Sequence, residues 1–239
     1  MSISIEHQIL FEDNHLLVIN KPAPLPTMGV AADQDSLATL AKQYLKKAYN
    51  KPGNVYLGVV SRLDSFVTGV IVFARTSKAA ARLSKQFADR STSKSYWAIV
   101  PTMDAKAIGD SWQMENWVLK DEANHRMQTV SEQRGKAKLA KLNATKIARF
   151  EDTDLLRVEL LTGRKHQIRV QLSSAGFPIV GDNKYGSKRS FSQGIALHSY
   201  HLAFDHPTKK EPVSIYGDPP NYWKIGRFGS LSDLRKVGS

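Results

Sequence analysis

An arginine and an aspartate two positions apart stand out in this sequence as side chains that could do chemistry. Arg62 and Asp64 precede a short polar turn, and an apolar run from Val70 to Ala74 follows. This run is short, β-branched and aromatic, which is typical of a buried strand. Gly69 at its start indicates a bend or the close approach of another backbone segment. A carboxylate at the mouth of a buried strand is either one half of a structural ion pair or a group that acts on a substrate.

The charge of the chain points to a polyanionic partner. The sequence has 34 lysines and arginines against 22 acidic residues, which gives a net charge of +12 and a sequence pI near 9.8. Nucleic acid is the commonest partner of so basic a chain. The alternative is a basic surface that only keeps the protein in solution.

Several other classes of site are not supported by the sequence. There are no cysteines, which excludes disulfides and thiolate metal sites. No phosphate-cradling loop or dinucleotide fingerprint occurs, so we expect no cofactor. The histidines lack a compact metal-ligand spacing with a carboxylate, so we expect no metal; those considered are His166, His198, His201 and His206.

Strands outnumber helices along the chain. The patterns predict helices over 36–49, 78–89 and 164–176, and strands within 9–22 and over 70–74, 94–100, 155–161, 195–204 and 211–215. Because the strands do not alternate with helices one for one, we expect an α+β fold with a mixed, mostly antiparallel sheet. Residues 111–150 are interpreted as antiparallel strands and a variable insertion, and residues 217–239 as a poorly ordered tail.

We expect one catalytic domain over residues 1–239, with a core from about 9 to 215. The N-terminus shows no signal-peptide pattern and no apolar run reaches transmembrane length, so we expect a soluble, cytoplasmic protein without membrane contact.

Five stretches resemble the motifs of the RluA-type RNA pseudouridine synthases, and they occur in family order. The stretch 61–69 resembles the catalytic motif, His-Arg-Leu-Asp followed by Thr-Ser-Gly, whose aspartate falls on Asp64. Ser61 replaces the family histidine, and Val67 and Thr68 replace the Thr-Ser pair. Serine can still form a local backbone hydrogen bond, so we expect activity to be retained. The other similar stretches are Asn-Lys-Pro at 20–22, Lys-Ser-Tyr at 94–96, Gly-Arg-Lys-His-Gln-Ile-Arg at 163–169 and the closing strand around 196–207.

The resemblance implies roles for individual residues. Asp64 would be the catalytic carboxylate, Arg164 the partner that keeps it charged and in place, and Tyr96 an aromatic side chain that stacks on the target base. Ile168 would form an apolar wall of the pocket, or be an ordinary core residue. Arg62 would fill the space left by an extruded uridine, or simply pair with Asp64.

Basic residues near the entrance are candidates for phosphate contacts that position RNA without reading its sequence. They are Lys165, Arg169, Lys184, Lys188 and Arg189. The Asn-Lys-Pro motif begins so early that we expect no separate N-terminal RNA-binding module, and we expect a monomer.

The leading hypothesis is therefore an RNA pseudouridine synthase that acts on uridine in rRNA or tRNA. A non-catalytic RNA-binding or RNA-folding protein on the same scaffold is the alternative, although binding alone would not require Asp64. A hydrolase that uses Asp64 with a water is disfavoured, because no second carboxylate or metal site is evident.

Overall fold

The computed structural model describes residues 5–31, 34–102 and 110–223, and the chain divides into two compact units. The first unit comprises residues 1–94 and 199–220, and the second comprises residues 95–198 and 221–239. The expectation of a single catalytic domain stays a prediction.

The first unit is built on strands in the order β1-β2-β4-β10. A short 3-10 helix, η1 (Glu6–Gln8), precedes them, and two further strands pair at the sides: β3 with β4, and β11 with β10. The strands are β1 (Ile9–Glu12), β2 (Leu16–Lys21), β3 (Gly58–Val59), β4 (Thr68–Ala74), β10 (Leu197–Asp205) and β11 (Pro212–Tyr216). The pairings β1–β2, β2–β4, β3–β4 and β10–β11 are antiparallel.

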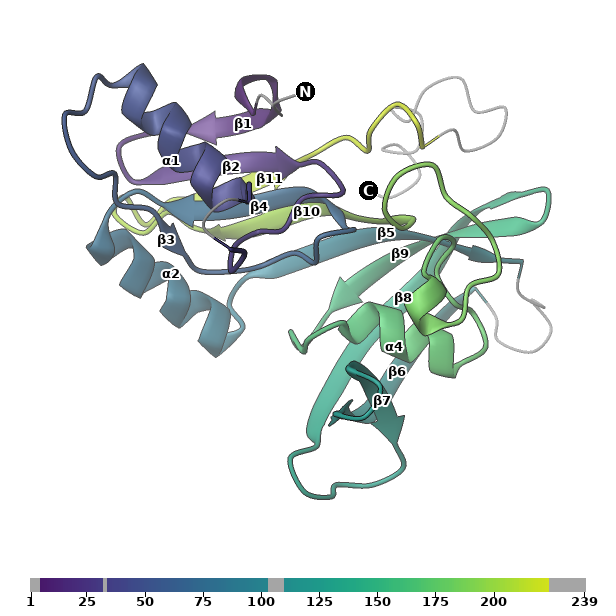
Figure 1. Cartoon of the computed structure of the whole chain (residues 1–239). Coiled ribbons are helices and arrows are strands. Elements are labelled where there is room, and N and C mark those ends of the chain that lie inside the picture. The colour runs from purple at the N-terminus through teal and green to yellow at the C-terminus, as the bar shows by residue number, and fades with distance from the viewer. Residues whose placement is uncertain (1–4, 32–33, 103–109, 224–239) are drawn as a thin grey trace. The chain divides into compact units, whose positions relative to one another are not determined.

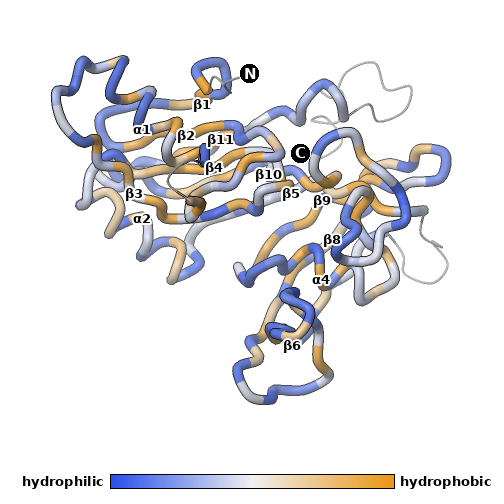
Figure 2. Tube along the Cα trace, in the orientation of Figure 1, coloured by the Kyte–Doolittle hydropathy of each residue, from blue (hydrophilic) through white to orange (hydrophobic). Residues whose placement is uncertain are grey.

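Two helices cover opposite faces of this sheet, α1 (Leu37–Ala48) and α2 (Ser77–Asp89) (Figure 1). Successive side chains of a strand point to opposite faces. Accordingly, Leu17 and Ile19 of β2 pack in the cluster that contains α1, while Leu16 and Val18 pack in the cluster that contains α2. All seven residues of β4 are buried because both faces are covered. In Figure 2, β2 and β4 are correspondingly orange along much of their length.

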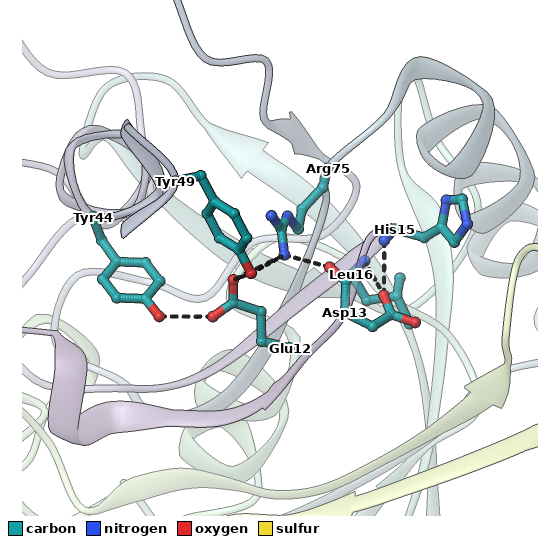
Figure 3. A network of polar contacts seen from close by, with 7 residues as sticks. All are labelled: Glu12, Asp13, His15, Leu16, Tyr44, Tyr49 and Arg75. Atoms are coloured by element: carbon teal, nitrogen blue, oxygen red, sulfur yellow. Dashed lines mark hydrogen bonds and ion pairs between the residues drawn. The ribbon is translucent and has the colours of Figure 1, made fainter. Parts of the chain in front are cut away.

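A polar network fixes the Ala74 end of β4 (Figure 3). Glu12 at the end of β1 accepts hydrogen bonds from the Tyr44 hydroxyl at 2.8 Å and the Tyr49 hydroxyl at 2.7 Å, and it pairs with Arg75 at 2.8 Å. The hydrogen bond to Glu12, together with burial, raises the pKa of Tyr44 to about 12. The Arg75 guanidinium lies 4.4 Å from the centre of the Tyr49 ring and also donates to the Asp13 carbonyl. The end of α1 is thereby joined to both β1 and β4.

The second unit is an antiparallel sheet in the order β5-β9-β8-β6-β7. Helix α4 and the 3-10 helix η2 accompany it, and Val170 of α4 and Tyr185 of η2 pack with Val118 of β6 and Ala140 of β8. The elements are β5 (Ser93–Pro101), β6 (Ser111–Asp121), β7 (Arg126–Val130), β8 (Lys138–Phe150), β9 (Thr153–Leu160), α4 (Gln167–Ser174) and η2 (Asn183–Tyr185).

The predicted α+β class with mostly antiparallel strands is confirmed. The strands expected within 111–150 are β6, β7 and β8, whereas the two-residue strand β3 is missing from the prediction. For residues 217–223 the prediction of a poorly ordered tail is wrong: Trp223 is 2% exposed, and its ring packs edge-on against Phe191 and His198. Residues 224–239 lie outside the described part of the chain. Within the described ranges, no helix has the length and hydropathy needed to cross a bilayer.

Candidate active site

Asp64 opens a tight turn that leads directly into β4. Its carbonyl accepts the Val67 N–H at 3.1 Å, which places Ser65 and Phe66 at the tip of the turn. On one side of Asp64, Leu63 packs against the α1 core cluster. On the other side, β4 is buried from its first residue. The Asp64 side chain is thus partly exposed while the backbone on both sides is held by the core.

Gly69 allows the strand to pass unusually close to β10. Its φ is +116°, and a Cβ built on it would lie 2.3 Å from the Ser199 carbonyl oxygen. No L side chain fits at that distance, and positive φ is costly for any residue other than glycine. The predicted close backbone approach is therefore confirmed, five residues after Asp64.

A loop from Pro22 to Met28 supports the Asp64 turn from one side. The Leu25 N–H donates to the Ser65 carbonyl at 2.9 Å, and the Thr27 hydroxyl both donates to the Leu63 carbonyl at 2.7 Å and accepts the Leu63 N–H at 3.2 Å. Helix α1 in turn holds this loop.

The first N–H groups of a helix have no partner within the helix. In α1, the N–H of Leu37 donates to the Pro26 carbonyl at 2.9 Å and that of Ala38 to the Thr27 carbonyl at 3.0 Å. The N–H of Thr39 donates to the side chain of Ser36. The start of α1 is thus satisfied by the same loop that holds the Asp64 turn.

Lys21 is buried beneath the Asp64 turn and links it to the loop. Its side chain is 1% exposed, and Nζ donates to the carbonyls of Pro22 at 2.9 Å, Leu25 at 2.7 Å and Ser65 at 3.1 Å. Burial lowers the pKa of Lys21 to about 7, and attraction to the Asp64 carboxylate opposes that shift. Our sequence analysis assigned no role to Lys21. The available signal was a lysine that directly continues a buried apolar strand before three closely spaced prolines.

In the second unit, the Arg164 backbone is fixed by a buried glutamine. Gln167, 3% exposed, accepts hydrogen bonds from the Arg164 N–H at 2.9 Å and the Thr162 hydroxyl at 2.8 Å. Its amide nitrogen donates to the Lys141 carbonyl at 3.0 Å. The guanidinium of Arg164 is only partly exposed, and its Nε donates to the Leu139 carbonyl at 2.9 Å.

His166 forms the N-terminal cap of α4 in a left-handed conformation, with φ of 53°. Its Nδ1 lies 2.8 Å from the Tyr185 hydroxyl, which also accepts the Met127 N–H at 3.0 Å. The sequence analysis considered His166 only as a metal ligand. Its spacing to Tyr185 gave no signal for this contact.

The remaining predicted site residues of the second unit differ in exposure. Lys165 is exposed, Ile168 is 4% exposed and Tyr96 on β5 is 8% exposed. Arg169 is 5% exposed, and its Nε and Nη2 donate to the two carboxylate oxygens of Asp182 at 2.7 and 2.8 Å. The geometry thus assigns Arg169 to a buried ion pair within the unit rather than to a surface that meets phosphate.

The predicted site residues are divided between the two units. Arg62 and Asp64 belong to the first unit, and Tyr96, Arg164, Lys165, Ile168 and Arg169 belong to the second. In the part of the chain that the structure describes, no group of three or more histidine or carboxylate side chains lies close enough together to hold a metal ion.

Comparisons with known proteins agree on one family. The family model described as RNA pseudouridylate synthase matches residues 15–174. The dual-specificity RNA pseudouridine synthase RluA of Vibrio vulnificus is 35% identical over 208 residues, covering 84% of this chain and 78% of the relative. Ribosomal large subunit pseudouridine synthase D of Zymomonas mobilis is 32% identical over 228 residues, covering 89% of this chain and 69% of the relative.

A solved structure supports the fold. The human RNA pseudouridylate synthase domain containing 4 superposes with a TM-score of 0.77 at 23% identity, covering 97% of this chain and 94% of the human one. The matched motifs, the sequence identity and the fold lead to one conclusion: this chain belongs to the RNA pseudouridylate synthase family.

Proposed function

We propose that this protein isomerises uridine in RNA to pseudouridine, with Asp64 as the carboxylate that acts on the bound nucleotide. The observation that carries this role is the placement of Asp64. Its side chain is partly exposed, yet its turn is fixed by the loop, by Lys21 and by the close approach at Gly69. A catalytic group requires this combination of access and fixed geometry.

The reaction suits a site with a single carboxylate. The bond between N1 of the base and C1′ of the ribose breaks, the base turns, and C5 of the base bonds to C1′. The hydrogen on C5 is lost to solvent as a proton, and N1 takes up a proton from solvent. Atoms balance without a second substrate. Asp64 would act as a nucleophile or as a base toward the sugar.

The other predicted residues would hold the RNA. A uridine inside folded RNA must leave its stack to be reached, at a cost of about a few kcal/mol. Arg62 is exposed two residues before Asp64, where it can fill the vacated space or pair with the carboxylate. Tyr96 would stack on the base, and Arg164 and Lys165 would supply positive charge. Ile168 would contribute an apolar wall. Arg169 is not included among the RNA-binding residues, because its guanidinium already donates two hydrogen bonds to Asp182.

We propose that the substrate is rRNA or tRNA, without choosing between them. One relative is named for the large ribosomal subunit and another as dual-specificity, and the net charge of +12 fits either RNA. A monomer in the cytoplasm stays our expectation.

The test is release of tritium from RNA labelled at uridine C5. Wild-type protein is incubated with labelled total tRNA and with labelled rRNA, beside Asp64→Asn and a matched control, Asp89→Asn. Asp89 is an exposed carboxylate at the end of α2 in the same unit. We expect release by the wild type and by Asp89→Asn, and none by Asp64→Asn.

Two results would oppose the proposal. Wild-type protein that binds both RNAs without releasing tritium from either would favour a protein that only binds RNA. Equal release by Asp64→Asn and wild type would remove Asp64 from the chemistry while leaving the activity in place.

A further inference from the structure

The turn that carries Asp64 also exposes an aromatic side chain. Phe66 is 50% exposed, although it lies between the partly exposed Asp64 and the buried Val67. Residues two apart along the chain lie within about 7 Å of each other at full extension. Phe66 is therefore held within about 7 Å of the Asp64 backbone, at the tip of a turn closed by a hydrogen bond.

A second exposed apolar side chain lies beside this turn. Met28 is 46% exposed and directly follows Thr27, which is 3% exposed and bonded to both backbone groups of Leu63. Because Thr27 is fixed to Leu63, Met28 is held near Arg62, the residue before Leu63. Met28, Arg62 and Phe66 are exposed residues of these two segments around Asp64, and we call these three residues the Asp64 rim.

The composition of the Asp64 rim fits a nucleotide better than it fits water. Exposure of a phenylalanine ring to water is unfavourable, and a nucleotide base can cover the ring by stacking on it. An exposed arginine supplies charge for the phosphate that joins two nucleotides. A methionine is flexible and polarisable, and it adapts to the surface of a base. Single exposed apolar residues need no explanation, but two of them around one carboxylate and one arginine form a specific combination.

We propose that the Asp64 rim binds the nucleotide adjacent to the target uridine, and that Phe66 stacks on the base of that nucleotide. This inference rests on the proposed function for the identity of the target. It adds a recognition surface within the first unit that reads the flanking base by stacking. Since stacking tolerates every base, the rim would favour strongly stacking purines over pyrimidines without selecting a single one.

The experiment uses the fluorescence of 2-aminopurine, which is quenched when the base stacks. The probes are nine-nucleotide single-stranded RNAs with a central uridine and 2-aminopurine immediately 5′ of it, immediately 3′ of it, or at the far end. The whole chain is used with Asp64→Asn, so that binding is observed without turnover. The added variants are Phe66→Leu, which keeps an apolar side chain, and Phe66→Tyr, which keeps an aromatic ring.

Tyr56→Leu is the matched control. Tyr56 is 49% exposed in the same unit but precedes β3, which pairs with the Ala74 end of β4. The Asp64 turn lies at the Thr68 end, so the seven residues of β4 separate the two sites.

We expect quenching of one of the two flanking probes and none of the far-end probe. Phe66→Leu should abolish that quench and weaken binding at least about fivefold, the lower end of the loss of one base–aromatic stack. Phe66→Tyr should retain both the quench and the affinity, and Tyr56→Leu should bind as its parent does. A quench that survives Phe66→Leu, or no quench of either flanking probe by the parent protein, overturns the inference.

These results are separable from the proposed function. Tritium release by the wild type combined with unaltered binding by Phe66→Leu would support the synthase activity and refute the proposed role of the Asp64 rim. A Phe66-dependent quench without any tritium release would support nucleotide binding by the Asp64 rim and refute the synthase activity.

Discussion

Replacing Lys21 by methionine should remove a rise in the free energy of unfolding of the first unit that the wild type shows above pH 7. The ammonium group is 1% exposed and its pKa lies near 7 in the folded protein, against 10.5 for a free lysine. Below pH 7 both the folded and the unfolded chain carry the proton, so the folded state bears the full cost of the buried charge. Between pH 7 and 10.5 the folded chain releases the proton while the unfolded chain retains it, and the free energy of unfolding rises with pH.

The magnitude follows from the size of the shift. Each pH unit in this window adds about 1.36 kcal/mol to the wild-type free energy of unfolding. From pH 6 to pH 9 the wild type should therefore gain about 3 kcal/mol over Lys21→Met, which has no proton to release. A second loss is present at every pH, because the variant leaves the buried Leu25 carbonyl without its donor, at about 1–3 kcal/mol.

Urea unfolding at pH 6 and pH 9, followed by far-ultraviolet circular dichroism, measures both terms. The longer helices α1 and α2 belong to the first unit, so the signal reports mainly on that unit. Lys42→Met, an exposed lysine on α1, is the control and should change little at either pH. If the stability gap between wild type and Lys21→Met is the same at pH 6 and pH 9, the reasoning from the buried ammonium is refuted.

Two further predictions concern the close approach and the buried ion pair. Gly69→Ala should lower the free energy of unfolding by about 2–5 kcal/mol, because an alanine Cβ would combine backbone strain with a clash against Ser199; an unfolding midpoint in urea equal to that of wild type would contradict the geometry. Asp182→Leu should cost about 3–5 kcal/mol by leaving the Arg169 charge buried and unpaired, and adding Arg169→Met should recover most of that loss. Tryptophan fluorescence measures the second case, since all four tryptophans lie in the second unit, and a double variant no more stable than Asp182→Leu would argue against an unpaired charge.

The sequence predicted elements whose patterns are local. The apolar run of β2 and the side-chain caps of α1 and α2 depend on residues close in sequence, so these elements occur where they were expected. The helix expected over 164–176 is shorter, because His166 adopts a left-handed conformation and α4 begins at Gln167. The two residues of β3 are too few to produce any alternation.

The sequence analysis named candidate site residues but did not identify the residues that hold them in place. Asp64 was named from a short motif, and that motif carries no information about what holds the turn. The supports come from Lys21 and Thr27, which reach the turn from 44 and 36 residues away in sequence. Arg169 shows the opposite error, since basic character indicated a surface contact while its partner, Asp182, lies 13 residues further on and buries it. Contacts at such separations depend on tertiary structure, which local patterns in a single sequence do not reveal.

The anchoring of the Pro22–Met28 loop has a consequence for how the protein matures. A carboxylate on an autonomous hairpin would be in position as soon as its own residues met. Here the Asp64 turn is completed only when β2, the first turn of α1 and the start of β4 have all come together, and such distant contacts form late and slowly. A nascent chain that has not finished folding its first unit therefore carries the Asp64 carboxylate on a turn that is not yet held in place.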